Sequence, residues 1–366
     1  MLYKKLGKPI LFRMDPEKAH HLTIDGLSAV VSFPGGKQLL KSMYGVPNSP
    51  LLAQQLWGIQ FANPIGLAAG LDKNAKAVKG FSQLGFGFME VGTITPKPQP
   101  GNELPRLFRL PEDKALINRM GFNNVGTEVM AKNLMKTGKR DIPVAINIGK
   151  NKTTPNEQAE EDYRACIREL YTYGDFFVVN ISSPNTPDLR NLQHGSDLKR
   201  LLDAVTTEMQ LQQKKNGHSG KPVLVKIAPD LTDEELELTV QTIKIHSGIS
   251  GIIATNTTLS RQGLVHPNRE QAGGLSGKPL TQRTTEVIRR VYQLTEGKLP
   301  IIGSGGIFTA QDAYDKIRAG ASLVEVYTGF IYEGPGMLAS LNKGLQDLLR
   351  RDGYTHISEA IGADHH

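Results

Sequence analysis

The chain has 366 residues, enough for one large α/β domain or for two ordinary domains. Its composition, 39% hydrophobic and 22% charged, is that of a folded globular protein and excludes a disordered chain. The formal net charge of +7 suits an anionic partner such as phosphate, nucleic acid or a lipid surface, but the charge is spread along the chain and selects none of them.

The N-terminal segment is predicted to contain a helix from Asp15 to Val31, with Asp15 as its cap and Pro16 in its first turn. The helix has an apolar stripe formed by Ala19, Leu22, Leu27 and Val30. The basic residues that precede it are Lys4, Lys5, Lys8 and Arg13. This segment either caps the folded domain or lies on an anionic membrane surface, and the pattern alone leaves both interpretations open.

Short apolar runs then alternate with longer amphipathic ones. The predicted strands are Ile65–Ala69, Phe86–Gly92, Pro143–Ile148, Phe176–Ile181, Val223–Ala228, Gly251–Thr255, Pro300–Gly303 and Ser322–Tyr327. The predicted helices are Asn74–Leu84, Asn123–Thr137, Asn156–Tyr173, Asp197–Lys214, Asp233–His246, Thr281–Leu294, Ala310–Ala319 and Gly336–Leu349. Strands that are apolar on consecutive residues are typical of a parallel sheet covered on both faces.

This alternation predicts a (β/α)8 TIM barrel over residues 46–366, preceded by a small N-terminal helical extension over residues 1–45. A doubly wound open sheet is the alternative, but the Gly-rich dinucleotide turn that would follow its first strand is missing. Two long insertions, residues 94–122 and 257–279, are expected to be functional lids or disordered.

The single cysteine, Cys166, is expected to be a small buried hydrophobe rather than a catalytic thiol. With one cysteine no intrachain disulfide is possible, which favours a reducing compartment. No apolar run approaches the roughly 20 residues of a membrane span, and no secretory signal is evident. We therefore expect a protein that is neither secreted nor membrane-spanning.

Polar residues and glycines follow the predicted strands, at the end of a barrel where chemistry takes place. They are Gly70, Lys73, Gly92, Thr93, Asn147, Gly149, Asn180, Ser183, Asn185, Lys226, Thr255, Asn256, Thr257, Gly305, Gly306, Tyr327 and Thr328. Each one alone fits an ordinary turn or cap, but the complete set predicts an active site. Because Lys226 lies within an apolar strand, its charge requires a compensating partner.

The last two strand ends predict a phosphate site. Gly303–Gly306 can present backbone N–H groups to an anion, and Tyr327 and Thr328 add hydroxyls. With Asn147, Asn180 and Lys226 nearby, flavin mononucleotide (FMN) fits, because its ring gains negative charge on reduction.

The remaining groups predict a pocket for a small substrate rich in amide and carboxylate groups, because Asn118, Asn180, Asn185 and Asn256 each offer a donor and an acceptor. Ser183 is the hydroxyl in the middle of this set, and no His, Asp or Glu stands at a predicted strand end to act as base. The histidines lack metal-ligand spacing, so no metal is expected, and no G-x-S-x-G motif supports a hydrolase.

These residues lie in segments that resemble dihydroorotate dehydrogenase, in its class 2, quinone-linked and membrane-associated branch. The segments are Asn63–Lys73, Arg106–Arg109, Asn118–Asn124, Asn147–Lys152, Asn180–Thr186, Val225–Asp230, Ala254–Thr258 and Gly273–Gly277. They cover nearly the whole chain in order.

The resemblance implies a flavoprotein oxidoreductase that converts (S)-dihydroorotate to orotate in de novo pyrimidine biosynthesis. Ser183 would remove the C5 proton, helped by Thr186 and Phe122. The implied substrate-binding residues are Lys73, Asn118, Arg119, Met120, Gly121, Phe122, Asn180, Asn185, Asn256 and Thr257. The implied FMN-binding residues are Ala69, Gly70, Lys73, Thr93, Asn147, Asn180, Lys226, Thr255, Gly277, Gly306, Tyr327 and Thr328.

For the N-terminal segment, the resemblance favours a quinone entrance lying on an anionic bilayer, with His20, Arg109 and Tyr327 at the quinone end. It implies a monomeric peripheral protein on the cytoplasmic face of the bacterial inner membrane, with no nucleic-acid partner. Three alternatives are a flavin barrel that reduces uridine in tRNA, a soluble class 1 dehydrogenase with Cys in place of Ser183, and a non-enzymatic barrel.

Overall fold

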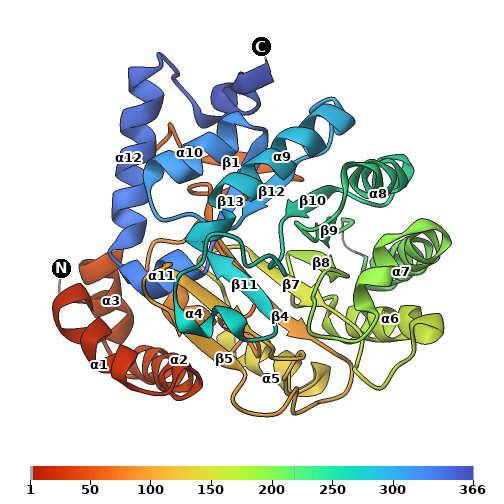
Figure 1. Cartoon of the computed structure of the whole chain (residues 1–366), viewed down its shortest axis with the longest axis horizontal. Helices are drawn as coiled ribbons and strands as arrows, with labels where there is room; N and C mark the ends of the chain where they lie inside the picture. The colour runs from red at the N-terminus through yellow and green to blue at the C-terminus, as the bar shows by residue number, and fades with distance from the viewer. Residues whose placement is uncertain (1–2, 218, 366) are drawn as a thin grey trace.

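A computed structural model describes residues 3–217 and 219–365, so the first two positions of the predicted N-terminal segment lie outside the described residues. Eight parallel strands close into a barrel in the order β10-β12-β13-β3-β4-β7-β8-β9 (Figure 1). Their bounds are β3 Ile65–Leu67, β4 Phe88–Ile94, β7 Val144–Ile148, β8 Phe176–Asn180, β9 Val223–Ile227, β10 Gly251–Ala254, β12 Ile301–Ser304 and β13 Ala321–Val326. The predicted TIM barrel is therefore confirmed, and the alternative of a doubly wound open sheet is wrong.

The helices that follow the strands surround the barrel (Figure 1). They are α4 Val78–Phe81, α5 Thr127–Thr137, α6 Ala159–Leu170, α7 Gly195–Asn216, α8 Asp233–Ile245, α9 Thr281–Thr295, α10 Ala310–Arg318, α11 Thr328–Glu333 and α12 Met337–Arg351. Short 3-10 turns are η2 Asn156–Gln158, η3 Leu189–Gln193, η4 Pro267–Glu270, η5 Lys278–Leu280, η6 Ile357–Ala360 and η7 Ala363–His365. Thr232 and Thr309 cap α8 and α10 with reciprocal capping boxes.

The first predicted helix, Asn74–Leu84, was mostly wrong, because α4 is a single turn. The buried carboxylate of Asp72 accepts the backbone N–H groups of Lys76 at 2.7 Å and Ala77 at 2.8 Å. These bonds hold the chain in a loop where the helix was expected. The loop carries Lys73 at the mouth of the barrel.

An aromatic cluster closes the amino-terminal end of the barrel. A hairpin of β1 Gln54–Leu56 and β2 Ile59–Phe61 lies there, and Trp57 at its turn donates to the carbonyl of Ser250 at 2.9 Å. Phe61 from the hairpin contacts Phe88 and Phe176 from the strands, with ring centroids 5.6 and 6.5 Å away. Access to the barrel interior is therefore from the opposite end.

The two long insertions form an ordered sheet across that opposite end. Strands β5 Leu107–Leu110 and β6 Ala115–Asn118 from the first insertion pair with β11 Gly274–Gly277 from the second, all antiparallel. Of the two expectations for these insertions, disorder was wrong, and a function as a lid stays a prediction. β11 lies in front of the barrel strands in Figure 1.

The N-terminal segment is helical, as predicted. A π-helical turn η1 Tyr3–Gly7 leads into α1 Lys8–Arg13, α2 Pro16–Ser32 and α3 Gly36–Tyr44. Asp15 caps α2 by accepting the N–H groups of Glu17 and Lys18, and α2 packs against α4 and β5.

The predicted apolar stripe of α2 was only partly confirmed, because not all of its residues face the barrel. Ala19 is buried and Leu27 meets Gly80 of α4 so closely that a Cβ there would lie 2.3 Å from Leu27 Cγ. Leu22, in contrast, is 54% exposed, and Ile24 is buried in its place. Within the described residues, we find no helix whose length and apolar character would suffice to cross a membrane.

Candidate active site

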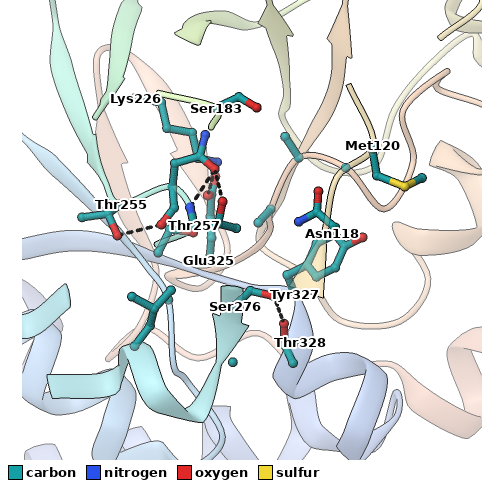
Figure 2. A pocket seen from close by; sticks show the side chains of 18 of the residues that line it. Asn118, Met120, Ser183, Lys226, Thr255, Thr257, Ser276, Glu325, Tyr327 and Thr328 are labelled. Carbon is teal, nitrogen blue, oxygen red and sulfur yellow. Dashed lines mark hydrogen bonds and ion pairs between the residues drawn. The ribbon is translucent and has the colours of Figure 1, made fainter. Parts of the chain in front are cut away.

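A single cavity at the carboxyl end of the barrel brings together most of the predicted site residues (Figure 2). It encloses about 1190 Å³, including the part that opens to solvent. The predicted residues that line it are His20, Ala69, Gly70, Lys73, Thr93, Asn118, Met120, Gly121, Phe122, Asn180, Ser183, Asn185, Lys226, Thr255, Asn256, Thr257, Gly277, Gly306, Tyr327 and Thr328. Asn147, Arg109 and Arg119 do not line it.

Asn147 lies directly beneath the cavity and holds its floor together. Its Nδ2 donates to Glu90 at 2.6 Å, and its Oδ1 accepts the hydroxyl of Thr93 at 2.5 Å. Asn180 Nδ2 in turn donates to Thr93 Oγ1 at 2.8 Å. This buried network fixes the directions in which Thr93 and Asn180 present their polar atoms.

Lys226 has the compensating partner that the sequence requires, in the form of two glutamates. Its Nζ lies 2.7 Å from Glu90 Oε2 and 3.4 Å from Glu325 Oε2, and all three side chains are buried. Figure 2 shows Lys226 of β9 and Glu325 of β13 near one another in the cavity. Although burial alone would lower the pKa of Lys226, the two glutamates raise it above its ordinary value.

Acids were sought only after the predicted strands, and two acids within the strands were overlooked. Glu90 lies in β4 and Glu325 in β13, and Glu325 lines the cavity. Burial and the neighbouring Glu90 raise the pKa of Glu325 to about 8. An acid inside an apolar strand was a visible signal, equivalent to the one that singled out Lys226.

Glycines shape the cavity beside β12 and β13. Gly306 has φ +71°, and a Cβ there would lie 2.3 Å from the backbone nitrogen of Thr281. Gly277 has φ +109° and would meet the carbonyl of Lys114 at 2.4 Å. Thr328 shares a hydrogen bond with Ser276 at 2.8 Å, drawn in Figure 2. The result is a cradle of backbone and hydroxyl groups in which side chains larger than glycine do not fit at these two positions.

The amide side chains form the opposite part of the cavity. Asn185 Nδ2 donates to Asn118 Oδ1 at 3.1 Å, and Asn256 Nδ2 donates to Asn180 Oδ1 at 3.3 Å. Ser183 lies among them, 7% exposed, and its Oγ accepts the N–H of Asn185 at 3.3 Å. The pocket thus offers donors, acceptors and one hydroxyl to a planar polar molecule.

Lys73 and His20 line the side of the cavity that faces the N-terminal helices. Burial lowers the pKa of Lys73 to about 8. Burial and the charge of Lys73 lower the pKa of His20 to about 3, so the imidazole is neutral near pH 7. Because His20 belongs to α2, the N-terminal segment supplies part of the cavity wall.

The two arginines lie outside the cavity and hold its surroundings. Arg109 donates to the carbonyls of Leu11, Phe12 and Met14 at 3.1, 3.3 and 2.8 Å. Arg119 lies over the ring of Phe108, 4.6 Å from its centroid.

The cavity also contains residues that the sequence did not single out as site residues. They are Ala68, Leu107, Ser276, Leu280, Ile307, Glu325, Val326 and Gly329. Ser304 and Gly305, which belong to the predicted phosphate turn, also line the cavity. Leu107 and Ser276 come from the sheet of insertions, whose fold gave no periodic signal.

Comparisons with known proteins agree with this geometry. Residues 51–349 match the family model described as dihydroorotate dehydrogenase. The chain is 54% identical to the dihydroorotate dehydrogenase (quinone) of Deinococcus deserti, covering 99% of this chain and 100% of that protein. It is also 54% identical to the protein of that name from Deinococcus radiodurans, over 97% and 98% of the two chains.

Among solved structures, DHODH from Eimeria tenella in complex with ferulenol superposes with a TM-score of 0.88 at 41% identity, covering 96% of each chain. These matches exclude a tRNA-reducing flavin barrel and a non-enzymatic barrel. The chain belongs to the dihydroorotate dehydrogenase family.

Proposed function

We propose that this oxidoreductase converts (S)-dihydroorotate to orotate and passes the electrons to a membrane quinone, as a step of de novo pyrimidine biosynthesis. The observation that carries the proposal is one cavity in which the glycine cradle, Lys226 and the amide pocket around Ser183 are all adjacent. The similarity to proteins named as the quinone-linked enzyme extends over 97–99% of the chain and so includes the N-terminal segment.

The family is flavin-dependent, and we propose FMN as the flavin. The cradle beside Gly277, Gly306 and Thr328 suits one phosphate, and Lys226 suits a ring edge that becomes negative. When bound, FMN would accept two electrons from the substrate and pass them to the quinone. The proposed FMN-binding residues are Ala69, Gly70, Lys73, Thr93, Asn147, Asn180, Lys226, Thr255, Gly277, Gly306, Tyr327 and Thr328.

The substrate would occupy the amide pocket. The proposed binding residues are Lys73, Asn118, Arg119, Met120, Gly121, Phe122, Asn180, Asn185, Asn256 and Thr257. Arg119 would act through the backbone conformation of this loop, because its side chain lies on the outer sheet. In this arrangement the amides orient the substrate and exclude water from its reacting carbons.

Ser183 would act as the base at C5. A serine hydroxyl is a weak base, so the proton it gains must be matched by one that it releases. The Oγ1 of Thr186 is buried and has no hydrogen-bond partner among the described residues, which suits a hydroxyl that accepts this proton in a relay. Phe122, held at φ +53° and lining the cavity, would shield the relay from solvent.

We propose that residues 1–45 form the quinone entrance of a monomeric peripheral enzyme and that residues 46–366 form its catalytic domain. The N-terminal helices expose large apolar side chains, namely Leu6, Ile10, Leu22, Phe33, Leu39 and Met43. Together with the neighbouring lysines, this surface suits an anionic bilayer at the cytoplasmic face of a bacterial inner membrane.

His20 and Tyr327 would contact the quinone from the cavity wall. Arg109 would hold the segment from Leu11 to Met14 in place at the entrance.

The function is tested by adding dihydroorotate to the purified protein with a soluble ubiquinone analogue, and separately with fumarate, as acceptor. We expect orotate formation with the quinone analogue and little with fumarate. Turnover with fumarate alone would overturn the quinone assignment. If the flavin-loaded protein forms no orotate with either acceptor, the proposed reaction is overturned.

A further inference from the structure

Two buried glutamates face the single positive charge of Lys226, although one carboxylate would be enough to neutralise it. Glu90, Lys226 and Glu325 converge from three different strands, and their exposures are 0%, 5% and 2%. With all three ionised, the group would carry a net negative charge inside the barrel. Burial of an uncompensated charge is costly, so one of the acids is expected to hold a proton.

The hydrogen bonds identify which acid remains ionised. Glu90 accepts three donors: Lys226 Nζ at 2.7 Å, Asn147 Nδ2 at 2.6 Å and the N–H of Ala69 at 3.0 Å. Such a set stabilises a carboxylate. Glu325 accepts only the longer contact from Lys226 at 3.4 Å among the described residues, and its Oε1 has no partner there. Glu325 is therefore the acid that takes the proton.

Among the described residues, no other charged group is found to act on Glu325 and reverse this assignment. Glu90 from β4 and Lys226 from β9 are the charged groups that act on it. The strands on either side of β13, namely β3 and β12, have no titratable side chains along Ile65–Leu67 and Ile301–Ser304.

Glu325 also lies at the cavity surface, whereas Glu90 does not. We propose that Glu325 is a positioning residue that holds a proton in the resting enzyme and whose ionisation is coupled to the charge of the flavin beside Lys226. This inference rests on the proposed cofactor and extends it to a residue at the cavity surface whose proton sets the charge there.

The coupling has a definite proton balance. Below the pKa of Glu325, the acid would keep its proton throughout, and a bound flavin would take up one proton with two electrons. A negatively charged reduced flavin would raise the pKa of Glu325. Between the pKa beside the oxidised flavin and this higher pKa, Glu325 would bind a second proton with the same two electrons. Burial and Glu90 place this transition near pH 8.

The test is the pH dependence of the midpoint potential of the flavin bound to the purified enzyme, measured between pH 6.5 and pH 9.5. In the wild type, we expect the uptake to rise from one to two protons per two electrons as the pH passes about 8. Glu325→Gln, which imitates the neutral acid, should bind the flavin and take up one proton at every pH. The matched control is Glu234→Gln, at an exposed position of α8, which should behave as the wild type.

Infrared spectroscopy of the same proteins gives a second readout that does not depend on flavin. A carbonyl stretch of a protonated acid should be present at pH 7 in the wild type, disappear by pH 9.5, and be missing in Glu325→Gln. One proton per two electrons at every pH in the wild type, or a two-proton region that persists in Glu325→Gln, would overturn the inference. If the purified protein contains no flavin, the proposed cofactor fails, and the infrared band alone decides whether Glu325 holds its proton.

Discussion

Within this site, most polar side chains hydrogen-bond to one another, and a few buried polar atoms have no partner among the described residues. The amide side chains mostly satisfy one another, as in the bond from Asn185 to Asn118 at 3.1 Å. The hydroxyl of Thr186 and one oxygen of Glu325 have no partner among the described residues. Such atoms are retained at a cost in stability, which is expected where a ligand or a transferred proton uses them.

The role of Ser183 is tested by Ser183→Ala. The variant should retain bound flavin, because no cradle residue is changed, but dihydroorotate should reduce that flavin about 10²–10⁴-fold more slowly, the usual contribution of a general base. Stopped-flow absorbance of the flavin measures this step without the quinone. Ser340→Ala, on the exposed face of α12, is the control. Equal reduction rates in both variants would remove Ser183 from the mechanism.

Glu325 also predicts a pH dependence of folding. Its pKa rises from an ordinary 4.5 to about 8 in the folded protein, so in this range the folded state holds a proton that the unfolded chain has lost. The stability that this group contributes is complete below pH 4.5 and is lost as the pH rises through about 8.

Denaturant titrations at several pH values should therefore show the free energy of unfolding of the wild type falling relative to that of Glu325→Gln as the pH rises. A difference between the two proteins that stays constant from pH 4.5 to pH 8 would contradict the assigned protonation state.

Sequence reasoning reached most single residues of the site for a physical reason. Lys226 stands out because a cation in an apolar strand needs a partner, and the same logic applied to Glu90 and Glu325 would have found that partner. Arg109 and Arg119 could not be placed, because a sequence does not show toward which side of an insertion a long side chain turns.

Secondary-structure elements divide into those that periodicity predicts and those that tertiary contacts create. The eight barrel strands follow from their apolar runs. In the sheet of β5, β6 and β11, strand β11 pairs with β6 although the two are more than a hundred residues apart in the sequence. A local sequence pattern cannot predict such a pairing. The same holds for the loop at Lys73, which hydrogen bonds to Asp72 keep out of a helix.

The contact between that sheet and the N-terminal helices depends on Arg109. In Arg109→Ala, the loss of hydrogen bonds from a charged group to three carbonyls should destabilise the docking of α1 and α2 by about 1–3 kcal/mol. Hydrogen exchange in residues 8–32 should become faster, and the KM for the quinone analogue should rise, while flavin reduction by dihydroorotate stays unchanged.

Arg269→Ala is the matched control, because Arg269 lies in η4, which contacts the same sheet, but donates to Leu264 and Glu270. If both variants raise the KM for quinone equally, Arg109 has no particular role at the entrance.

At the scale of the whole molecule, the barrel and the N-terminal helices share one cavity but expose different surfaces. The helices present Ile10 and Phe33, which are 63% and 69% exposed. Composition and charge alone did not decide between a cap and a membrane surface. In the fold, His20 of this segment lines the cavity, and the surface that we propose for the membrane stays exposed.

Membrane attachment is tested by replacing both of these residues with serine. Cosedimentation with vesicles containing anionic lipid should weaken by about tenfold for each large apolar side chain removed. The control is the same pair of changes at Leu238 and Ile245 of α8, which are 70% and 79% exposed. Comparable losses in the two pairs would show that the N-terminal surface is not the binding face.

The aromatic cluster at the amino-terminal end of the barrel has a consequence for the buried acids above it. Phe61, Phe88 and Phe176 are at most 1% exposed, so water does not reach Glu325 from below. The proton on Glu325 can exchange with solvent only through the cavity. A ligand bound in that cavity would block this route. The carboxyl proton of Glu325 would then exchange with deuterium only as fast as the ligand dissociates.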